Sequence, residues 1–383
     1  EDLLKWTIVS SLEEYYPEFP NVEIITPESY LWPDFLKRSN LLAIVNRIVV
    51  IAVIAIGMTL VIITGGIDLS VGSLIALSAV IATVIMKSLG GLEASVWTIP
   101  LGFLLGIACC GVVGGFGGFL VHRFKVAPFI TTLAVMMMAR GLAYKITGGF
   151  SIYQVPVGLP WLGRGTTMSI PNTVILLLVL YIVAHLFMSR TRFGRYIYAV
   201  GGNEEAARLS GVPIRTILIL VYVVSGLAAG LGGCIQASQL NTGTPNSGLM
   251  YELFVIAAVV IGGTSLSGGK GKIFGTLIGA FIISVLQNGL NLTGVDSYEQ
   301  QIILGGVILA AVLIDKMRGS EAGTFSKLKQ TQVKKWSWVT AAAVICVGSI
   351  IVVNKGSGSA PNGKIGMTCM DLTNPFFKLI GNK

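Results

Sequence analysis

The chain has 383 residues, of which 53% are hydrophobic and only 12% are charged, with a formal net charge of +9. Soluble domains carry roughly 25% charged residues, so this composition excludes an ordinary soluble enzyme and predicts a polytopic, all-α membrane protein. Basic loops on the cytoplasmic side explain the positive charge, and no nucleic-acid partner is expected.

The first 41 residues are acidic, with eight Asp or Glu and three Lys or Arg. The distribution of Lys and Arg among the loops places residues 1–41 on the non-cytoplasmic side. An N-terminal segment on that side needs an upstream membrane helix for its export, and the chain begins with Glu1 rather than Met. We therefore expect a processed or truncated start that lacks the first membrane helix.

Ten apolar segments follow, most of them long enough to cross a bilayer of about 30 Å. The seventh and ninth are short and are interpreted as tilted or half-length helices. Lys and Arg concentrate in the loops 189–213, 263–272 and 315–335, which predicts that these loops are cytoplasmic. The ten segments are 42–63, 71–86, 97–121, 127–147, 172–188, 214–235, 251–262, 273–290, 301–314 and 336–353.

The phrase G-G-x-x-L-S-x-G occurs twice, at residues 65–72 and 262–269, each time between two apolar segments. Both copies lie at cytoplasmic ends of segments that run the same way, which predicts a parallel internal repeat. Asp68 is an acid at membrane depth, so Asp68 and Ser70 are candidates for the substrate pathway. Alternatively, either side chain caps the helix that begins near Val71.

No nucleotide, metal or catalytic site is expected on this chain. Residues 266–269 imitate an ATPase signature, but the sequence contains no G-x-x-x-x-G-K-[ST] phosphate loop. The five cysteines and two histidines show no metal-ligand spacing. We therefore expect no bound cofactor.

The loop at 189–211 carries a second specific pattern. Asn203 is a good helix N-cap, and Glu204 and Glu205 favour the positive end of a helix dipole. The helix extends through Arg208, and Gly211 can end it. One interpretation is a docking helix for a motor subunit, and these five residues are its candidates. The alternative is a connector whose arginines lie at the lipid headgroups of the membrane.

Polar side chains also interrupt the apolar segments. Gln287, Asn288 and Asn291 in the eighth segment either form interhelical hydrogen bonds or line a solute path. Arg140, near the outer end of the fourth segment, is expected to extend toward the membrane surface. Glycines in the third segment are spaced by four residues and predict close helix packing.

The C-terminal residues divide into four parts. Residues 319–335 are a cytoplasmic linker, and residues 336–353 form an extra transmembrane anchor after a basic flank. Residues 354–363 are rich in Gly, Ser and Asn and are typical of a flexible linker. Residues 364–383 read as a strand and the start of a helix, so we expect the beginning of an α/β domain outside the membrane.

Three ordered motifs resemble the permease subunits of the ribose-type family of ABC sugar importers, over about residues 30–318. The motifs are 57–59 followed by 65–73, the loop 190–211, and 262–271 followed by 275–280. The resemblance implies a permease domain at 42–318 in a bacterial cytoplasmic (inner) membrane, paired with a second permease copy. It also implies a periplasmic sugar-binding protein and separate cytoplasmic ATPase subunits that hold ATP and Mg. Residues 203–211 would be the coupling helix that fits the ATPase.

Residues 364–377 resemble the mature start of a ribose-type periplasmic binding protein. In that family an Asn-Pro-Phe-Phe motif supplies an amide and two aromatic rings to the sugar, which implies sugar contacts from Asn374, Phe376 and Phe377. The chain would then be a permease fused to its own binding protein, with a periplasmic or extracellular tail. Alternatively, 336–353 is an uncleaved signal-like anchor of an adjoining gene product.

The sequence thus predicts an importer permease for a monosaccharide or related polyol rather than an enzyme. The alternative is an ion-coupled secondary sugar transporter, which needs titratable groups along its path. Asp68 and Glu252 are the candidates for that role.

Overall fold

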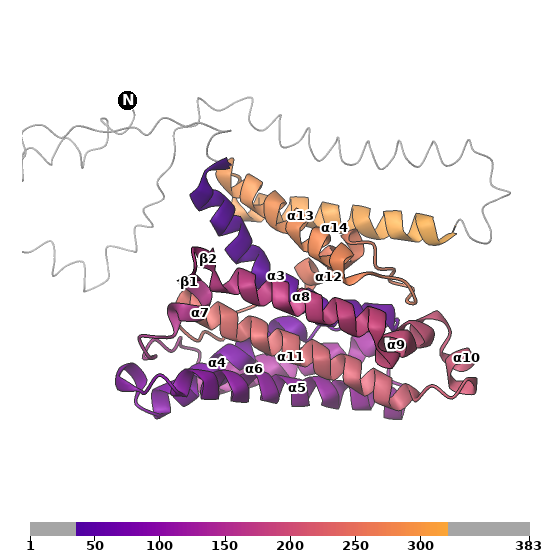
Figure 1. The fold of residues 1–383 in the computed structure, drawn as a ribbon, viewed down its shortest axis with the longest axis horizontal. Helices are drawn as coiled ribbons and strands as arrows, with labels where there is room; N and C mark the ends of the chain where they lie inside the picture. Colours follow the sequence, from indigo (N-terminus) through magenta and orange to yellow (C-terminus); the bar gives the residue numbers. More distant parts are fainter. Residues whose placement is uncertain (1–35, 321–383) are drawn as a thin grey trace, which may run out of the picture. The chain divides into compact units, whose positions relative to one another are not determined.

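Helices make up most of the fold, because nearly every apolar segment folds into one. The computed structural model describes residues 36–320 (Figure 1). The long and short helices are α3 (Arg38–Ile63), α4 (Val71–Ser88), η2 (Gly91–Glu93), α5 (Thr98–Phe124), α6 (Pro128–Thr147), α7 (Pro160–Arg164), α8 (Asn172–Arg190), α9 (Arg192–Gly202), α10 (Glu204–Leu209), α11 (Ile214–Leu240), α12 (Tyr251–Ile261), α13 (Ile273–Leu292) and α14 (Ser297–Ser320). A short antiparallel hairpin, β1 (Thr166–Thr167) and β2 (Ile170–Pro171), precedes α8.

Seven helices within residues 36–320 are long and apolar enough to cross a membrane: α3, α4, α5, α6, α8, α11 and α13. The predicted ten spans are therefore confirmed only in part. The seventh predicted segment is α12, whose 11 residues extend about 16 Å and cannot cross the bilayer alone. The ninth lies in α14, which has a shorter apolar stretch, Ser297–Leu313. The tenth, 336–353, lies outside the described residues.

Helix α11 is central to the packing and contacts α3, α4 and α5. These contacts bring backbones together, because small residues line the interfaces. A Cβ atom built on Gly226 of α11 would lie 2.2 Å from the carbonyl oxygen of Cys110 on α5. One built on Gly114 of α5 would lie 2.3 Å from the carbonyl oxygen of Tyr222. Small residues allow this approach where dispersion, rather than hydrophobic exclusion, holds helices together.

Side-chain hydroxyls form hydrogen bonds between the helices. Ser78 of α4 donates to the carbonyl of Gly230 on α11, at 2.7 Å. Tyr181 of α8 donates to the carbonyl of Ala52 on α3, at 2.9 Å. Such bonds satisfy hydroxyls that have no water to bind inside a bilayer. The packing therefore leaves α3 and α4 mostly buried, whereas α6 and α8 expose apolar faces.

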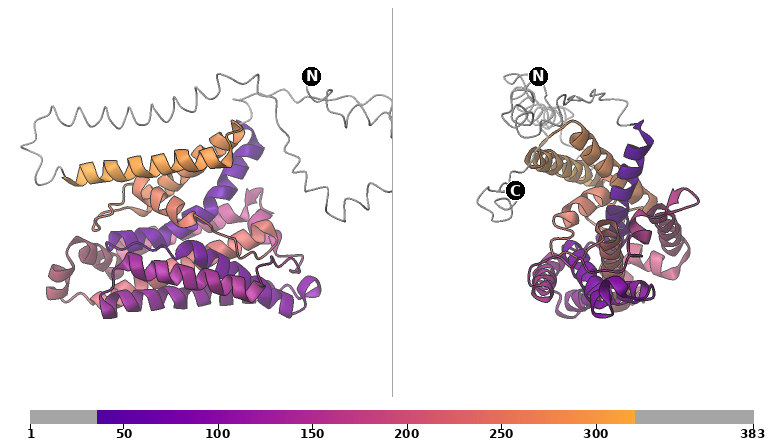
Figure 2. Two further views of the ribbon diagram at one scale, coloured as in Figure 1. Left: turned by 180° about the vertical axis from the view of Figure 1, so that it is seen from behind. Right: turned by 90° about the vertical axis from the view of Figure 1, so that its left-hand side faces the viewer.

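The two ends of the helix bundle carry different elements. Helices α9 and α10 lie at one end, whereas α7, β1 and β2 lie at the opposite end, as both broad views of the ribbon show (Figures 1 and 2). Helix α11 spans the distance between them. Its first residues contact α10, and Ser238 near its last residue accepts from the N–H of Gly163 on α7, at 2.7 Å.

The close contact at Gly226 generates the first prediction. Gly226→Ala forces a methyl group against the α5 backbone, so we expect the free energy of unfolding to fall by about 1–3 kcal/mol. Gly289→Ala is the matched control, because a Cβ atom there meets nothing within 4 Å. Thermal unfolding of the purified, detergent-solubilised chain checks this. Equal melting temperatures for the two variants would contradict the packing.

Candidate translocation and docking sites

The two copies of the glycine phrase end a helix in the same way. Gly65 after α3 and Gly263 after α12 both have positive φ, +80° and +88°. The next N–H in each case bonds back five residues, from Gly66 to the Val61 carbonyl (3.0 Å) and from Thr264 to the Val259 carbonyl (3.1 Å). This pattern is the Schellman motif. The glycine with positive φ is the first residue of the phrase in one copy, Gly65, and the second residue of the phrase in the other, Gly263.

Beyond these turns the two copies differ. In the first, α4 begins within the phrase, at Val71. In the second, the chain turns again at Gly268 and Gly269, and α13 begins only at Ile273. The likeness therefore covers the helix ends alone, and the predicted parallel repeat of two halves is not confirmed by this geometry.

The two copies contact each other, and α9 joins them. The N–H of Gly269 donates to the carbonyl of Ile63, the last residue of α3, at 2.8 Å. A Cβ atom on Gly201, near the end of α9, would lie 1.7 Å from the same carbonyl oxygen and 2.7 Å from the N of Gly269. Tyr198 of α9 donates its hydroxyl to the carbonyl of Gly271, at 2.8 Å. We call Ile63, Tyr198, Gly201, Gly269 and Gly271 the glycine junction.

Asp68 is held in the loop between α3 and α4. Its Oδ1 accepts from the N–H and the hydroxyl of Ser70, at 2.9 and 2.6 Å, and its Oδ2 accepts from the Ser225 hydroxyl of α11, at 2.7 Å. Burial raises the pKa of this carboxyl above its ordinary value, and the bonds from Ser70 and Ser225 oppose the rise. Neither Asp68 nor Ser70 is exposed. Ser70 occupies the N-cap position of α4 without a side-chain capping bond.

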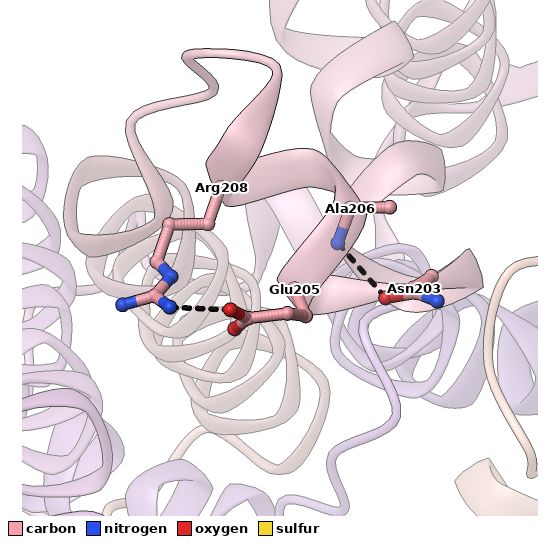
Figure 3. A network of polar contacts seen from close by, with 4 residues as sticks. All are labelled: Asn203, Glu205, Ala206 and Arg208. Atoms are coloured by element: carbon pink, nitrogen blue, oxygen red, sulfur yellow. Dashed lines mark hydrogen bonds and ion pairs between the residues drawn. The ribbon is translucent and has the colours of Figure 1, made fainter.

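Helix α10 forms on the surface beside the glycine junction. Asn203 caps it, since its Oδ1 accepts from the N–H of Ala206 at 2.9 Å (Figure 3). Glu205 and Arg208 face each other on the exposed side as an ion pair (Figure 3), and this contact raises the pKa of Arg208. Gly211, with a φ of +78°, ends the turn.

The exposed side of α10 is suited to a protein partner. The first turn carries two carboxylates, Glu204 and Glu205, and Leu209 is 80% exposed. An exposed ion pair contributes little to the stability of the helix, so these side chains remain available to a partner. The two short helices contact each other, so α10 connects through α9 to the glycine junction.

The three polar residues of α13 lie toward the far end of this helix, away from the glycine junction next to its start. Asn288 is 15 residues from the start of α13, or about 22 Å along it. Its side chain is buried, and within the described residues its Nδ2 has no hydrogen-bond partner. Asn291 accepts from Gln300 of α14 at 3.0 Å, which supports a bond between helices, and Gln287 is half-buried. Asn374, Phe376 and Phe377 lie outside the described residues.

The prediction from sequence for one charged residue, Arg140, is wrong. Arg140 of α6 turns inward and does not extend toward the surface. It donates to the carbonyls of Pro245 (2.7 Å), Ser247 (2.8 Å) and Gly72 (3.2 Å), so it fixes the loop between α11 and α12 against the start of α4. The acidic Glu252 also lies near it. The only signal in the sequence was an arginine well inside an apolar segment, which often marks an internal partner.

Within residues 36–320, no group of three or more His, Cys, Asp or Glu side chains could hold a metal ion.

Comparisons with known proteins identify the family. A family model described as "Branched-chain amino acid transport system / permease component" matches residues 40–312. The ribose import permease protein of Escherichia coli (strain K12) is 43% identical over 300 residues, which cover 77% of this chain and 91% of that protein. The ribose import permease protein of Bacillus subtilis (strain 168) is 43% identical over 294 residues, or 76% and 89%.

A third relative is a permease for a different sugar, D-allose. The D-allose transport system permease protein of Escherichia coli (strain K12) is 35% identical over 283 residues, which cover 74% of this chain and 85% of that protein. No solved structure matches the chain. Within the part of the chain that the structure describes, the matched range contains every candidate spanning helix and α10. The chain therefore belongs to this family of ABC importer permeases and is a membrane transport subunit rather than an enzyme.

Proposed function

We propose that this chain is the permease of an ABC importer that moves a monosaccharide or related polyol across the bacterial inner membrane. Its relatives are permeases for ribose import and D-allose transport, which supports this class of substrate. The observation that carries the mechanism is the glycine junction, which joins a surface helix to the end of α3 and to the loop between α12 and α13.

Energy reaches this chain from a separate ATPase that holds ATP and Mg. When the ATPase subunits close, they move α10 and, through it, α9. Gly201 of α9 lies against Ile63 and Gly269 without an intervening side chain, so a shift of α9 displaces the end of α3 and the loop between α12 and α13. A dense contact between backbones transmits displacement rather than absorbing it. The two glycine turns are the places where the chain bends in response.

The remaining parts of the chain have distinct roles in this proposal. Residues 42–318 are the permease, which pairs with a second copy. Residues 1–41 lie outside the cytoplasm, and 319–335 are a cytoplasmic linker. Residues 336–353 form an extra anchor, and 354–363 are a flexible linker to the binding domain that begins at 364–383. Tethering would hold that domain near the permease at an effective concentration of about a millimolar.

The supply of sugar comes from the binding domain or from a separate periplasmic binding protein. In the fused form, Asn374, Phe376 and Phe377 contact the sugar. Asp68, Ser70, Gln287, Asn288 and Asn291 are the pathway residues that the sequence suggested. The hydrogen bonds of Asp68 to Ser70 and Ser225 favour a structural role for its carboxylate. They weigh against a proton-carrying role in an ion-coupled transporter, and no comparison supports that alternative.

The acidic face of α10 provides the second prediction. We expect Glu204→Arg with Glu205→Arg to reduce sugar uptake by roughly tenfold or more, because opposing like charges at an interface cost several kcal/mol. Uptake is measured in proteoliposomes that contain the permease, its ATPase and its binding protein. Glu93→Arg, an exposed charge reversal in η2, is the control. Unchanged uptake by the double variant would remove α10 from the docking role.

Two adjacent glycines provide the third prediction. Gly201→Ala places a methyl group on the Ile63 carbonyl and must displace α9 or α3, whereas a Cβ atom on Gly202 meets nothing within 4 Å. We expect Gly201→Ala to lower the ratio of sugar transported to ATP hydrolysed by about tenfold, since overpacking disturbs a tight contact. Gly202→Ala should behave as the wild type. The same transport ratio in both variants would show that the junction does not couple the subunits.

A further inference from the structure

A pocket of about 310 Å³ opens at the end of the bundle that carries α7, opposite α10. Four helices contribute to it: α3, α7, α11 and α12. Its polar lining consists of Asn46, Arg47, Arg164, Gln236, Gln239 and Tyr251. Among the described residues that line the pocket, none is acidic. Under the proposed function this end faces outward, where sugar is delivered.

Part of the polar lining is fixed by hydrogen bonds within the protein. Gln239 of α11 donates its Nε2 to the carbonyl of Asn46 on α3, at 2.9 Å. Thr173 of α8 donates to the Oδ1 of Asn46, at 3.1 Å. Arg164 of α7 donates its Nε to the carbonyl of Gln239. These bonds hold the walls of the pocket in place before any ligand arrives.

Gln236 has hydrogen-bonding capacity that the protein does not use. Its Oε1 is buried and, within the described part of the chain, has no hydrogen-bond partner. An unpaired buried acceptor is unfavourable, so rotation of this amide toward a donor in the pocket would be favourable. A sugar hydroxyl can donate to such an oxygen, whereas a phosphate or carboxylate offers mainly acceptors.

We infer that this pocket is the first binding site for a neutral monosaccharide on the permease. Amides on two helices, the exposed guanidinium of Arg47 and the ring of Tyr251 together provide donors, an acceptor and an apolar face. The pocket volume is at the low end for small-molecule sites, which suits a single sugar ring. This inference rests on the proposed function, because it assigns that function its entry site.

The pocket is also connected to the glycine junction. Tyr251 is the first residue of α12, which ends at the second glycine turn. Asn46 and Arg47 belong to α3, which ends at the first. Thus α3 contributes Ile63 to the junction and Asn46 and Arg47 to the pocket, and α12 leads from the pocket to the loop that carries Gly269. Movement of those helix ends would change the walls around the sugar and release it.

The test compares two glutamines at the same end of the protein. Gln236→Met removes the amide at similar volume, and Gln154→Met is the control, because Gln154 is exposed and outside the pocket. Uptake of radiolabelled D-ribose and D-allose is measured in proteoliposomes with the complete transporter. We expect the apparent KM of Gln236→Met to rise roughly 3- to 10-fold, the value of one hydrogen bond, while stimulation of ATP hydrolysis by the binding protein persists.

A second variant reports on the pocket without transport. Leu240 lines the pocket and is 49% exposed, so Leu240→Cys places a thiol there and leaves the polar groups intact. We expect millimolar D-ribose or D-allose to slow its modification by a membrane-impermeant methanethiosulfonate, and ribose 5-phosphate to have no effect.

The outcomes separate this inference from the proposed function. If the wild-type transporter accumulates neither sugar, the proposed import of these two monosaccharides fails, whatever the pocket variants show. If it transports sugar while Gln236→Met matches Gln154→Met and sugars do not protect the thiol, the pocket is not the entry site. Protection by ribose 5-phosphate alone would identify an anion site and overturn the inference.

Discussion

The structure depends on one contact, in which the N–H of Gly269 binds the carbonyl of Ile63 and Gly201 lies against both. Three segments that are far apart in the sequence meet there without a side chain between them. A carbonyl at the end of a helix needs a donor, and inside a membrane protein water seldom supplies one. The second glycine phrase provides that donor. The contact therefore satisfies the backbone and couples the segments at once.

Under the proposed function, movement at this contact is transmitted along α3 and, through the loop that carries Gly269, along α12. Helix α3 has Asn46 and Arg47 near one end and Ile63 at the other, and α12 runs from Tyr251 to the second glycine turn. Helix α11 holds the loop between α3 and α4 in place through Ser225 and Asp68. In the account proposed here, a displacement of α10 at one end of the bundle alters the pocket at the other.

Local features of the structure could be predicted from sequence. The cap at Asn203, the end of α10 near Gly211 and the helix breaks at both glycine phrases follow from short-range chemistry. The partners could not be predicted, because they depend on tertiary packing. Arg140 shows the limit: its position in the sequence suggested the membrane surface, yet three loop and helix carbonyls bind it inside. The phrase repeat predicts two related halves, and the described residues support it as far as two similar helix ends.

The most direct measurement is hydrogen exchange by mass spectrometry on the complete transporter in nanodiscs, without nucleotide and with a non-hydrolysable ATP analogue. If α10 is coupled to the glycine turns, peptides covering 196–211, 60–66 and 262–272 change protection together when nucleotide binds. Because the Gly269 N–H is bonded to Ile63, its exchange reports directly on the junction. A change confined to 203–211, with the other two peptides unaffected, would contradict the coupling of α10 to the glycine turns.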